Sequence, residues 1–175
     1  PGPLPGSIDA HVTYAPGVYN ISGMLSIAAG VIITLDASKA DGDDFIFNVS
    51  SYLAFGAGVK VQVENGNVNT RVIWNVDSGY VTTGAGAEIV GTVMAGSYVS
   101  VGATSSIKSP GCFAGGAAYS AAGYVSLGDS AIIGSNNAFI ASCQAAAGQT
   151  GDVTTLAGNG SQGVANGNGI SASFK

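Results

Sequence analysis

A short phrase recurs five times along the middle of the chain, and this recurrence restricts the fold more than any other feature. Each copy is a brief alternation of apolar and small residues, followed by glycine or another small residue. Measured at Met24, Tyr52, Tyr80, Tyr98 and Tyr124, the intervals between copies are 28, 28, 18 and 26 residues. Intervals of this size are typical of a solenoid, in which every repeat forms one coil.

The phrase alternates with a period of two residues, which predicts a β-strand with one buried face. The residues expected to point inward are the pairs Leu25/Ile27, Leu53/Phe55, Val81/Thr83, Val99/Val101 and Val125/Leu127. A second phrase precedes most copies and places Tyr19, Phe47 and Trp74 at matching inward positions, with Asn20, Asn48 and Asn75 in an outward column. We expect shorter versions of it at Thr92–Ala95 and Cys112–Ala114. Together the phrases predict an all-β, three-sided parallel β-solenoid.

Composition narrows the function classes. Only 9% of the residues are charged, against about 25% in an average globular protein. Five Lys and Arg residues against ten Asp and Glu residues give a net charge of −5, which leaves no basic patch for phosphates or anionic lipids. We therefore expect no nucleic acid and no membrane among the partners. With one His and two Cys residues, we also expect no enzyme activity and no cofactor.

Two sequence features could bind metal, but we favour other interpretations. The run Asp41-Gly42-Asp43-Asp44 could hold Ca²⁺ through carboxylate oxygens, yet it also fits a capped turn before a strand, which we favour. His11 has no second His or Cys at metal-ligand spacing and is interpreted as a surface residue. We therefore expect neither a catalytic nor a metal site.

The outward columns beside the inward pairs are the candidate binding surface. One column is small and partly hydroxylated: Ser26, Ala54, Thr82, Ser100 and Ser126. Such a column suits a flat, rigid array that orders water. The neighbouring aromatic ridge of Tyr52, Tyr80, Tyr98 and Tyr124 is raised, which argues against a flat water-ordering surface on this face and leaves other small outward columns as alternatives. The ridge suits protein contact or sugar stacking instead, or simply stabilises adjacent coils.

The low charge and the two cysteines indicate a secreted, extracellular protein. We expect a disulfide between Cys112 and Cys143 that fastens the loop 109–121 to the last coil, although two free thiols are the alternative. Glycosylation sequons stand at Asn20, Asn48 and Asn159, and they matter only for a eukaryotic source.

Several phrases in order resemble the microbial ice-binding protein family. They are Ala15-Pro16-Gly17-Val18-Tyr19, Asp41 to Phe47, Arg71 to Val76 and Gly84 to Ala95. The resemblance covers about residues 15–135 and corresponds to the C-terminal half of that family's discontinuous β-solenoid. It implies ice binding, and it implies that the family's N-terminal coils and long helix are missing here.

The remaining residues are interpreted as arms around a solenoid domain of residues 15–144. Residues 1–14 form an extended N-terminal arm, and residues 145–175 form a Gly/Ser/Asn-rich C-terminal arm. The tail 152–175 resembles the start of an NHL-type β-propeller repeat. Val12 with Tyr14, and Val153 with Thr155, are the residues that we expect the arms to bury when they add strands to a neighbouring subunit.

These observations favour a non-enzymatic extracellular structural protein that self-assembles head-to-tail through its arms. The alternative is an ice-binding or antifreeze protein that adsorbs to ice through a flat face of small residues. Extracellular polysaccharide is a third possible partner.

Overall fold

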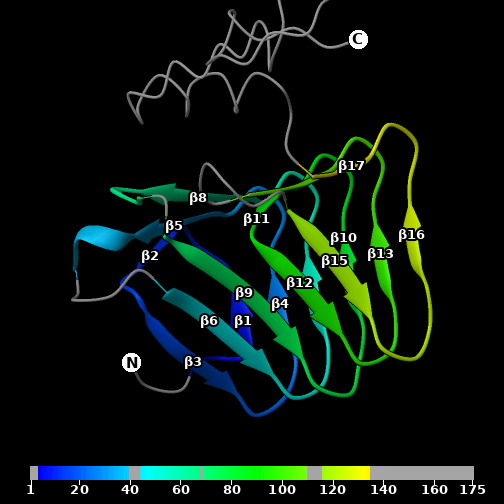
Figure 1. The fold of residues 1–175 in the computed structure, drawn as a ribbon, viewed down its shortest axis with the longest axis horizontal. Helices are drawn as coiled ribbons and strands as arrows, with labels where there is room; N and C mark the ends of the chain where they lie inside the picture. Colours follow the sequence, from blue (N-terminus) through cyan, green and yellow to red (C-terminus); the bar gives the residue numbers. More distant parts are fainter. Residues whose placement is uncertain (1–3, 40–43, 68, 110–115, 135–175) are drawn as a thin grey trace, which may run out of the picture. The chain divides into compact units, whose positions relative to one another are not determined.

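The computed structural model describes residues 4–39, 44–67, 69–109 and 116–134 (Figure 1). The chain divides into two compact units, residues 1–140 and 141–175, and all the described residues belong to the first. Within them the chain forms seventeen strands and one short 3₁₀ helix, η1 (Ala37–Lys39). No helix in this part of the chain is long and apolar enough to cross a membrane.

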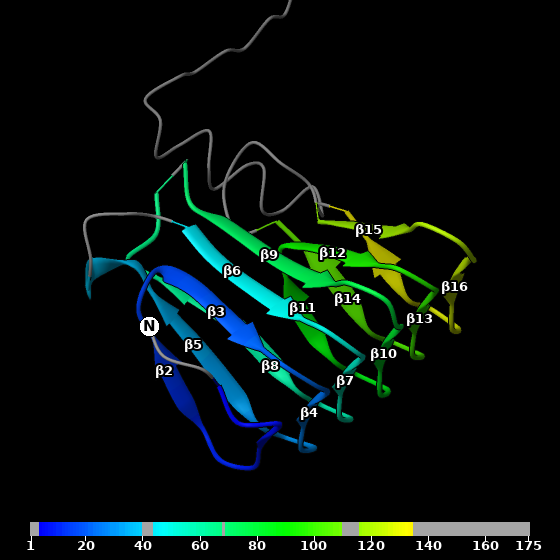
Figure 2. The same ribbon diagram turned by 90° about the horizontal axis from the view of Figure 1, so that it is seen from below.

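The strands form three sheets, which we call A, B and C, and each coil contributes one strand to each sheet in turn (Figures 1 and 2). Sheet A contains β1 (Ser7–Ile8), β4 (Leu25–Ile27), β7 (Leu53–Phe55), β10 (Val81–Thr83), β13 (Val99–Val101) and β16 (Val125–Leu127). Sheet B contains β2 (Val12–Tyr14), β5 (Ile32–Asp36), β8 (Lys60–Glu64), β11 (Glu88–Val90), β14 (Ser106–Lys108) and β17 (Ile132–Ile133). Sheet C contains β3 (Gly17–Ile21), β6 (Asp44–Val49), β9 (Arg71–Val76), β12 (Thr92–Ala95) and β15 (Ala117–Ser120).

Every strand pairs in parallel with the equivalent strands of the next coils, so the predicted three-sided parallel β-solenoid is confirmed. The described residues contain five complete coils and the first two strands of a sixth.

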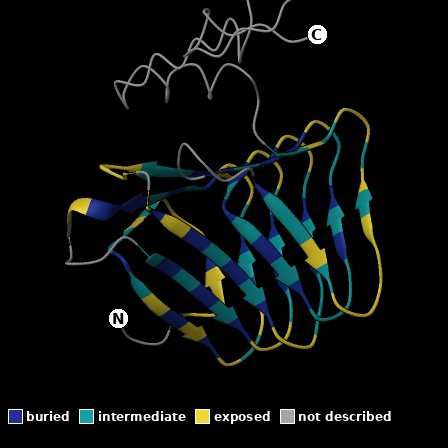
Figure 3. Cartoon of the chain, in the orientation of Figure 1, coloured by how far each residue is buried: buried dark blue, intermediate teal, exposed yellow. Residues whose placement is uncertain are grey.

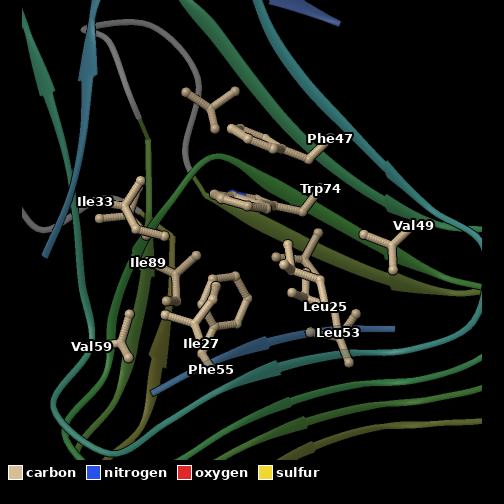
Figure 4. Packing of buried hydrophobic residues seen from close by; sticks show 14 of the residues in the cluster. Leu25, Ile27, Ile33, Phe47, Val49, Leu53, Phe55, Val59, Trp74 and Ile89 are labelled. Carbon is tan, nitrogen blue, oxygen red and sulfur yellow. The ribbon is translucent and has the colours of Figure 1, made fainter. Parts of the chain in front are cut away.

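The core lies between the three sheets and is built from the inward residues that the alternation predicts (Figure 4). Trp74 stacks on Phe47 at 4.2 Å between ring centroids, and Phe47 stacks on Tyr19 at 5.1 Å. Phe55 meets Trp74 edge-on at 5.2 Å. The predicted aromatic column is therefore present, and all four side chains are buried.

Close contact between coils requires glycine at some corners. A Cβ atom at Gly79 would lie 1.7 Å from the carbonyl oxygen of Ser51 in the coil before it. At the equivalent corner two coils earlier, a Cβ atom at Gly23 would meet nothing within 4 Å. The glycine is thus a steric requirement at Gly79 and not at Gly23.

The structure differs from the sequence analysis at the N-terminal arm. Val12 and Tyr14 belong to β2, which pairs with β5 of the same chain in the register Val12↔Ile33 and Tyr14↔Leu35. The Tyr14 ring lies 5.1 Å from Tyr19, and Leu4 also packs against the core. In this chain, therefore, Val12 and Tyr14 cover their own first coil, whereas the sequence analysis expected them to add a strand to a neighbouring subunit.

Two further expectations are corrected at the other end of the solenoid. The strand that pairs with Thr92–Ala95 is Ala117–Ser120, not Cys112–Ala114, which lies outside the described residues. Val125 and Leu127 stand in register with the buried Val99 and Val101. They are nevertheless 40% and 54% exposed, because the described residues place no further coil over them (Figure 3).

Candidate functional site

The outer face of sheet A brings the predicted small residues together in one column. Ser26 pairs with Ala54, Ala54 with Thr82, Thr82 with Ser100 and Ser100 with Ser126. Ser7 extends the column by one coil, since it pairs with Ser26. Sequence reasoning missed Ser7 because β1 is only two residues long and no tyrosine phrase precedes it. We call these six residues the small-residue column.

The tyrosine ridge borders this column as a stacked ladder. Ring centroids are 5.1 Å apart for Tyr52 and Tyr80, 4.9 Å for Tyr80 and Tyr98, and 5.3 Å for Tyr98 and Tyr124, with interplanar angles of 7°, 7° and 16°. At one end the Tyr52 hydroxyl donates to the Met24 Sδ atom at 2.6 Å. Because the rings cover one another's faces, the ladder presents ring edges and hydroxyls to solvent. A sugar ring stacks on an aromatic face, so this arrangement does not suit the expected sugar stacking along the ridge.

Sheet B presents an uneven, charged outer face. Lys60 and Glu88 are adjacent in register, and Lys108 Nζ lies 3.5 Å from Glu88 Oε2. His11 also has a specific role at this face, because its Nδ1 accepts a hydrogen bond from the backbone N–H of Ile32 at 3.0 Å. Its imidazole therefore links the first coil to the second and is more than an ordinary surface group.

Sheet C carries an amide ladder in the predicted asparagine column. Asn48 donates to Asn20 at 3.0 Å, and Asn75 donates to Asn48 at 3.2 Å. The side-chain nitrogen of Asn48, one predicted glycosylation site, is thus engaged in the fold, whereas Asn20 lies exposed at the end of the ladder.

An ion pair joins the first residues of two adjacent strands of sheet C, β6 and β9. Arg71 Nε donates to Asp44 Oδ1 at 2.7 Å, and a second hydrogen bond joins Arg71 Nη2 to Asp44 Oδ2. These hydrogen bonds, together with the positive charge of Arg71, hold the pKa of the Asp44 carboxyl below its usual value. Asp44 opens β6, whereas Asp41 and Asp43 lie outside the described residues.

The described part of the chain contains no group of three or more His, Cys, Asp or Glu residues that could hold a metal ion. The remaining predicted sites fall outside the described residues: Cys112, Cys143, Val153, Thr155 and Asn159.

Three parallel sheets around an aromatic core, with distinct outer faces, define a solenoid suited to surface recognition. The family described as Ice-binding-like matches residues 5–133 of this chain. The chain therefore belongs to the Ice-binding-like family, whose members are non-enzymatic. No curated protein sequence matches the chain significantly.

Two solved structures share the fold. A glycosylated ice-binding protein from an Arctic yeast has 23% sequence identity and a TM-score of 0.59, and the match covers 75% of this chain and 50% of that protein. An ice-binding protein from the Antarctic ascomycete Antarctomyces psychrotrophicus has 20% identity and a TM-score of 0.59, with coverage of 77% and 60%. The chain thus spans only half to three fifths of these proteins, and the family match begins ten residues before the predicted boundary at residue 15.

Proposed function

We propose that this domain binds ice through the outer face of sheet A, with the small-residue column as the contact surface. The observation that carries the proposal is the unbroken register of this column across six coils, in a chain of the Ice-binding-like family. The solved ice-binding proteins that share the fold add support.

The geometry of sheet A suits water ordering. Parallel backbone hydrogen bonds fix adjacent strands about 4.8 Å apart, so side chains of the column repeat at a constant spacing along the solenoid. The side chains are short and have few rotamers, and therefore little conformational entropy is lost when they meet a solid surface. The face is also free of the charges that make sheet B uneven, since the column contains only Ser, Ala and Thr residues.

The tyrosine ladder then acts as a stiffener along one side of the contact surface. The stacked rings connect successive coils outside the core, on the same outer side of the solenoid as the small-residue column. This role agrees with the expected stabilisation of neighbouring coils and requires no ligand on the ring faces.

A matched pair of substitutions tests the proposed face. Thr82 lies in the small-residue column of sheet A, and Thr92 has an outward position on sheet C with a similar intermediate exposure. Thr82→Tyr should abolish thermal hysteresis without changing the circular dichroism spectrum, whereas Thr92→Tyr should leave thermal hysteresis intact. Loss of thermal hysteresis in Thr92→Tyr but not in Thr82→Tyr would indicate that ice contacts sheet C. Full thermal hysteresis in both variants would exclude both faces as the contact surface.

Self-assembly is the second candidate function, and one observation favours it. The last coil of the described residues exposes Val125, Leu127 and Ile132, and Ile132 is 54% exposed. A second copy could cover these apolar side chains. Because β1 and β2 pair with strands of their own chain, we assign the expected strand donation to residues 145–175. Sedimentation velocity at increasing concentration tests this candidate: a single monomeric species throughout would contradict it.

We place either function outside the cell. Low charge, small residues and family membership support an extracellular setting. Detection of the protein in the medium of its native host, with none in washed cells, is the corresponding measurement.

A further inference from the structure

We propose that a hollow on the outer side of sheet C binds one sugar unit of a neutral polysaccharide. The hollow has a volume of about 280 Å³ and is formed where β9, β12 and β15 end. This site is separate from the small-residue column of sheet A and does not depend on ice binding.

The hollow exists because the outer surface of sheet C changes after the third coil. The amide ladder ends at Asn75, and the next residues in its column are Met94 and Tyr119. Two residues further along each strand, the outward positions are Asp77, Gly96 and Ala121, all of which line the hollow. Gly96 and Ala121 leave the space that longer side chains would fill.

The backbone keeps this space open at Gly96. A Cβ atom there would lie 2.2 Å from the carbonyl oxygen of Asp77, so no side chain can occupy the position without displacing the neighbouring coil. The hollow is therefore a consequence of how tightly the third and fourth coils pack.

The groups around the hollow suit a sugar ring. Tyr119 is 60% exposed and, with Met94, gives an apolar wall against which the C–H groups of a sugar can pack. The Asp77 side chain is exposed and has no hydrogen bond or ion pair within the described residues, so its oxygens are available to accept hydrogen bonds from sugar hydroxyls. Asn75 adds an amide at the same edge.

Other ligand classes fit less well. The hollow is slightly smaller than typical drug-sized ligand sites, which begin at about 300 Å³, so it suits one ring of a chain that continues across the surface. An anionic ligand would meet the Asp77 carboxylate on a chain of net charge −5. An organic cation is usually held by a cage of several aromatic rings, whereas Tyr119 is the one aromatic residue among the described residues that line this hollow.

Affinity electrophoresis in gels that contain a soluble polysaccharide tests the proposal. The probes are hydroxyethyl cellulose, xylan and mixed-linkage β-glucan, with alginate as the anionic comparison. We expect at least one neutral polysaccharide to retard the protein, and alginate to have no effect. Tyr119→Ala should weaken binding at least tenfold, and Ala121→Trp should fill the hollow and abolish retardation.

Tyr124→Ala is the matched control, because Tyr124 is also 60% exposed but lies at the end of the tyrosine ladder, outside the hollow. It should retain full binding. If Tyr119→Ala unfolds the domain, Asp77→Asn provides the second test and should weaken binding at least threefold with an unchanged melting temperature. No retardation by any neutral polysaccharide, equal loss in Tyr124→Ala, or stronger retardation by alginate would each overturn the proposal.

Discussion

Trp74 provides the sharpest test of the core, and we predict that Trp74→Ala removes most of the stability of the domain. The side chain is fully buried, stacks on Phe47 and meets Phe55 edge-on. Its indole Nε1 also donates a hydrogen bond to the backbone oxygen of Val90 at 2.9 Å, which ties sheet C to sheet B. Truncation to alanine therefore removes an apolar ring, two aromatic contacts and one buried hydrogen bond.

The size of the effect follows from these contacts. Truncating a buried aromatic side chain to alanine costs about 3–5 kcal/mol. Loss of the indole hydrogen bond leaves the Val90 carbonyl without this donor. A buried carbonyl without a partner costs about 1–3 kcal/mol, and we add about 1 kcal/mol to the loss of stability. We therefore expect the free energy of unfolding to fall by about 4–6 kcal/mol, a large part of the roughly 5–15 kcal/mol that holds a typical domain together.

Urea denaturation followed by circular dichroism measures this loss, since Trp74 is the single tryptophan of the chain and its replacement removes the fluorescent probe. Trp74→Phe is the matched control. It keeps a ring beside Phe47 and loses mainly the hydrogen bond, so it should cost about 1–3 kcal/mol. A loss below about 2 kcal/mol in Trp74→Ala would refute the assignment of Trp74 to the core. Red-shifted, easily quenched fluorescence of the unmodified protein would refute it too.

Three further predictions concern the coil corners, the ladder and the ion pair. Gly79→Ala should destabilise the domain by more than about 2 kcal/mol because its Cβ atom meets the preceding coil, whereas Gly23→Ala should change the unfolding free energy by less than about 1 kcal/mol; equal melting temperatures would contradict this. Tyr98→Ala should lower stability by about 1–2 kcal/mol and Tyr98→Phe by less than half of that in urea denaturation, since the stacking and not the hydroxyl matters. The lowered pKa of Asp44 means that its contribution to stability is present above the unfolded-state pKa of about 3.9 and is lost as the pH falls through the folded-state pKa. Arg71→Met should therefore flatten the melting-temperature profile slightly in that acid range, and a profile as steep as that of the unmodified protein would contradict the assignment.

The sequence was sufficient to predict the strands that carry the recurring phrase. Alternation located the buried pairs from Leu25 to Val101, and matching phrases aligned Tyr19, Phe47 and Trp74 in one column. These predictions succeeded because a parallel solenoid places equivalent residues of successive coils directly beside each other. Residues that occupy the same position in two copies of a repeated phrase are therefore neighbours in the structure.

The first two strands of the first coil were not assigned to the solenoid, because they carry neither recurring phrase. β1 is only two residues long and was missed, whereas β2 was expected as a strand of the N-terminal arm that would pair with a neighbouring subunit. What makes them strands is pairing with β4 and β5, together with the burial of Ile8 against the core. The strand Ala117–Ser120 escaped for a related reason: Ala and Ser residues carry little β-propensity, and its register with β12 decides its structure.

The outer faces were predictable only in part. The small-residue column and the tyrosine ridge follow directly from register, but the covered ring faces of the ladder depend on side-chain rotamers. The hollow beside Asp77 depends on the local packing at Gly96, which a one-dimensional pattern does not contain. The role of His11 depends on the position of the Ile32 backbone N–H, 21 residues away.

The most direct test of the proposed function is to grow a single-crystal hemisphere of ice in a dilute solution of the fluorescently labelled protein. We predict that the protein is incorporated into the ice and marks defined crystal planes, and that Thr82→Tyr is excluded from the growing crystal. Complete exclusion of the unmodified, folded protein from the ice would contradict the account.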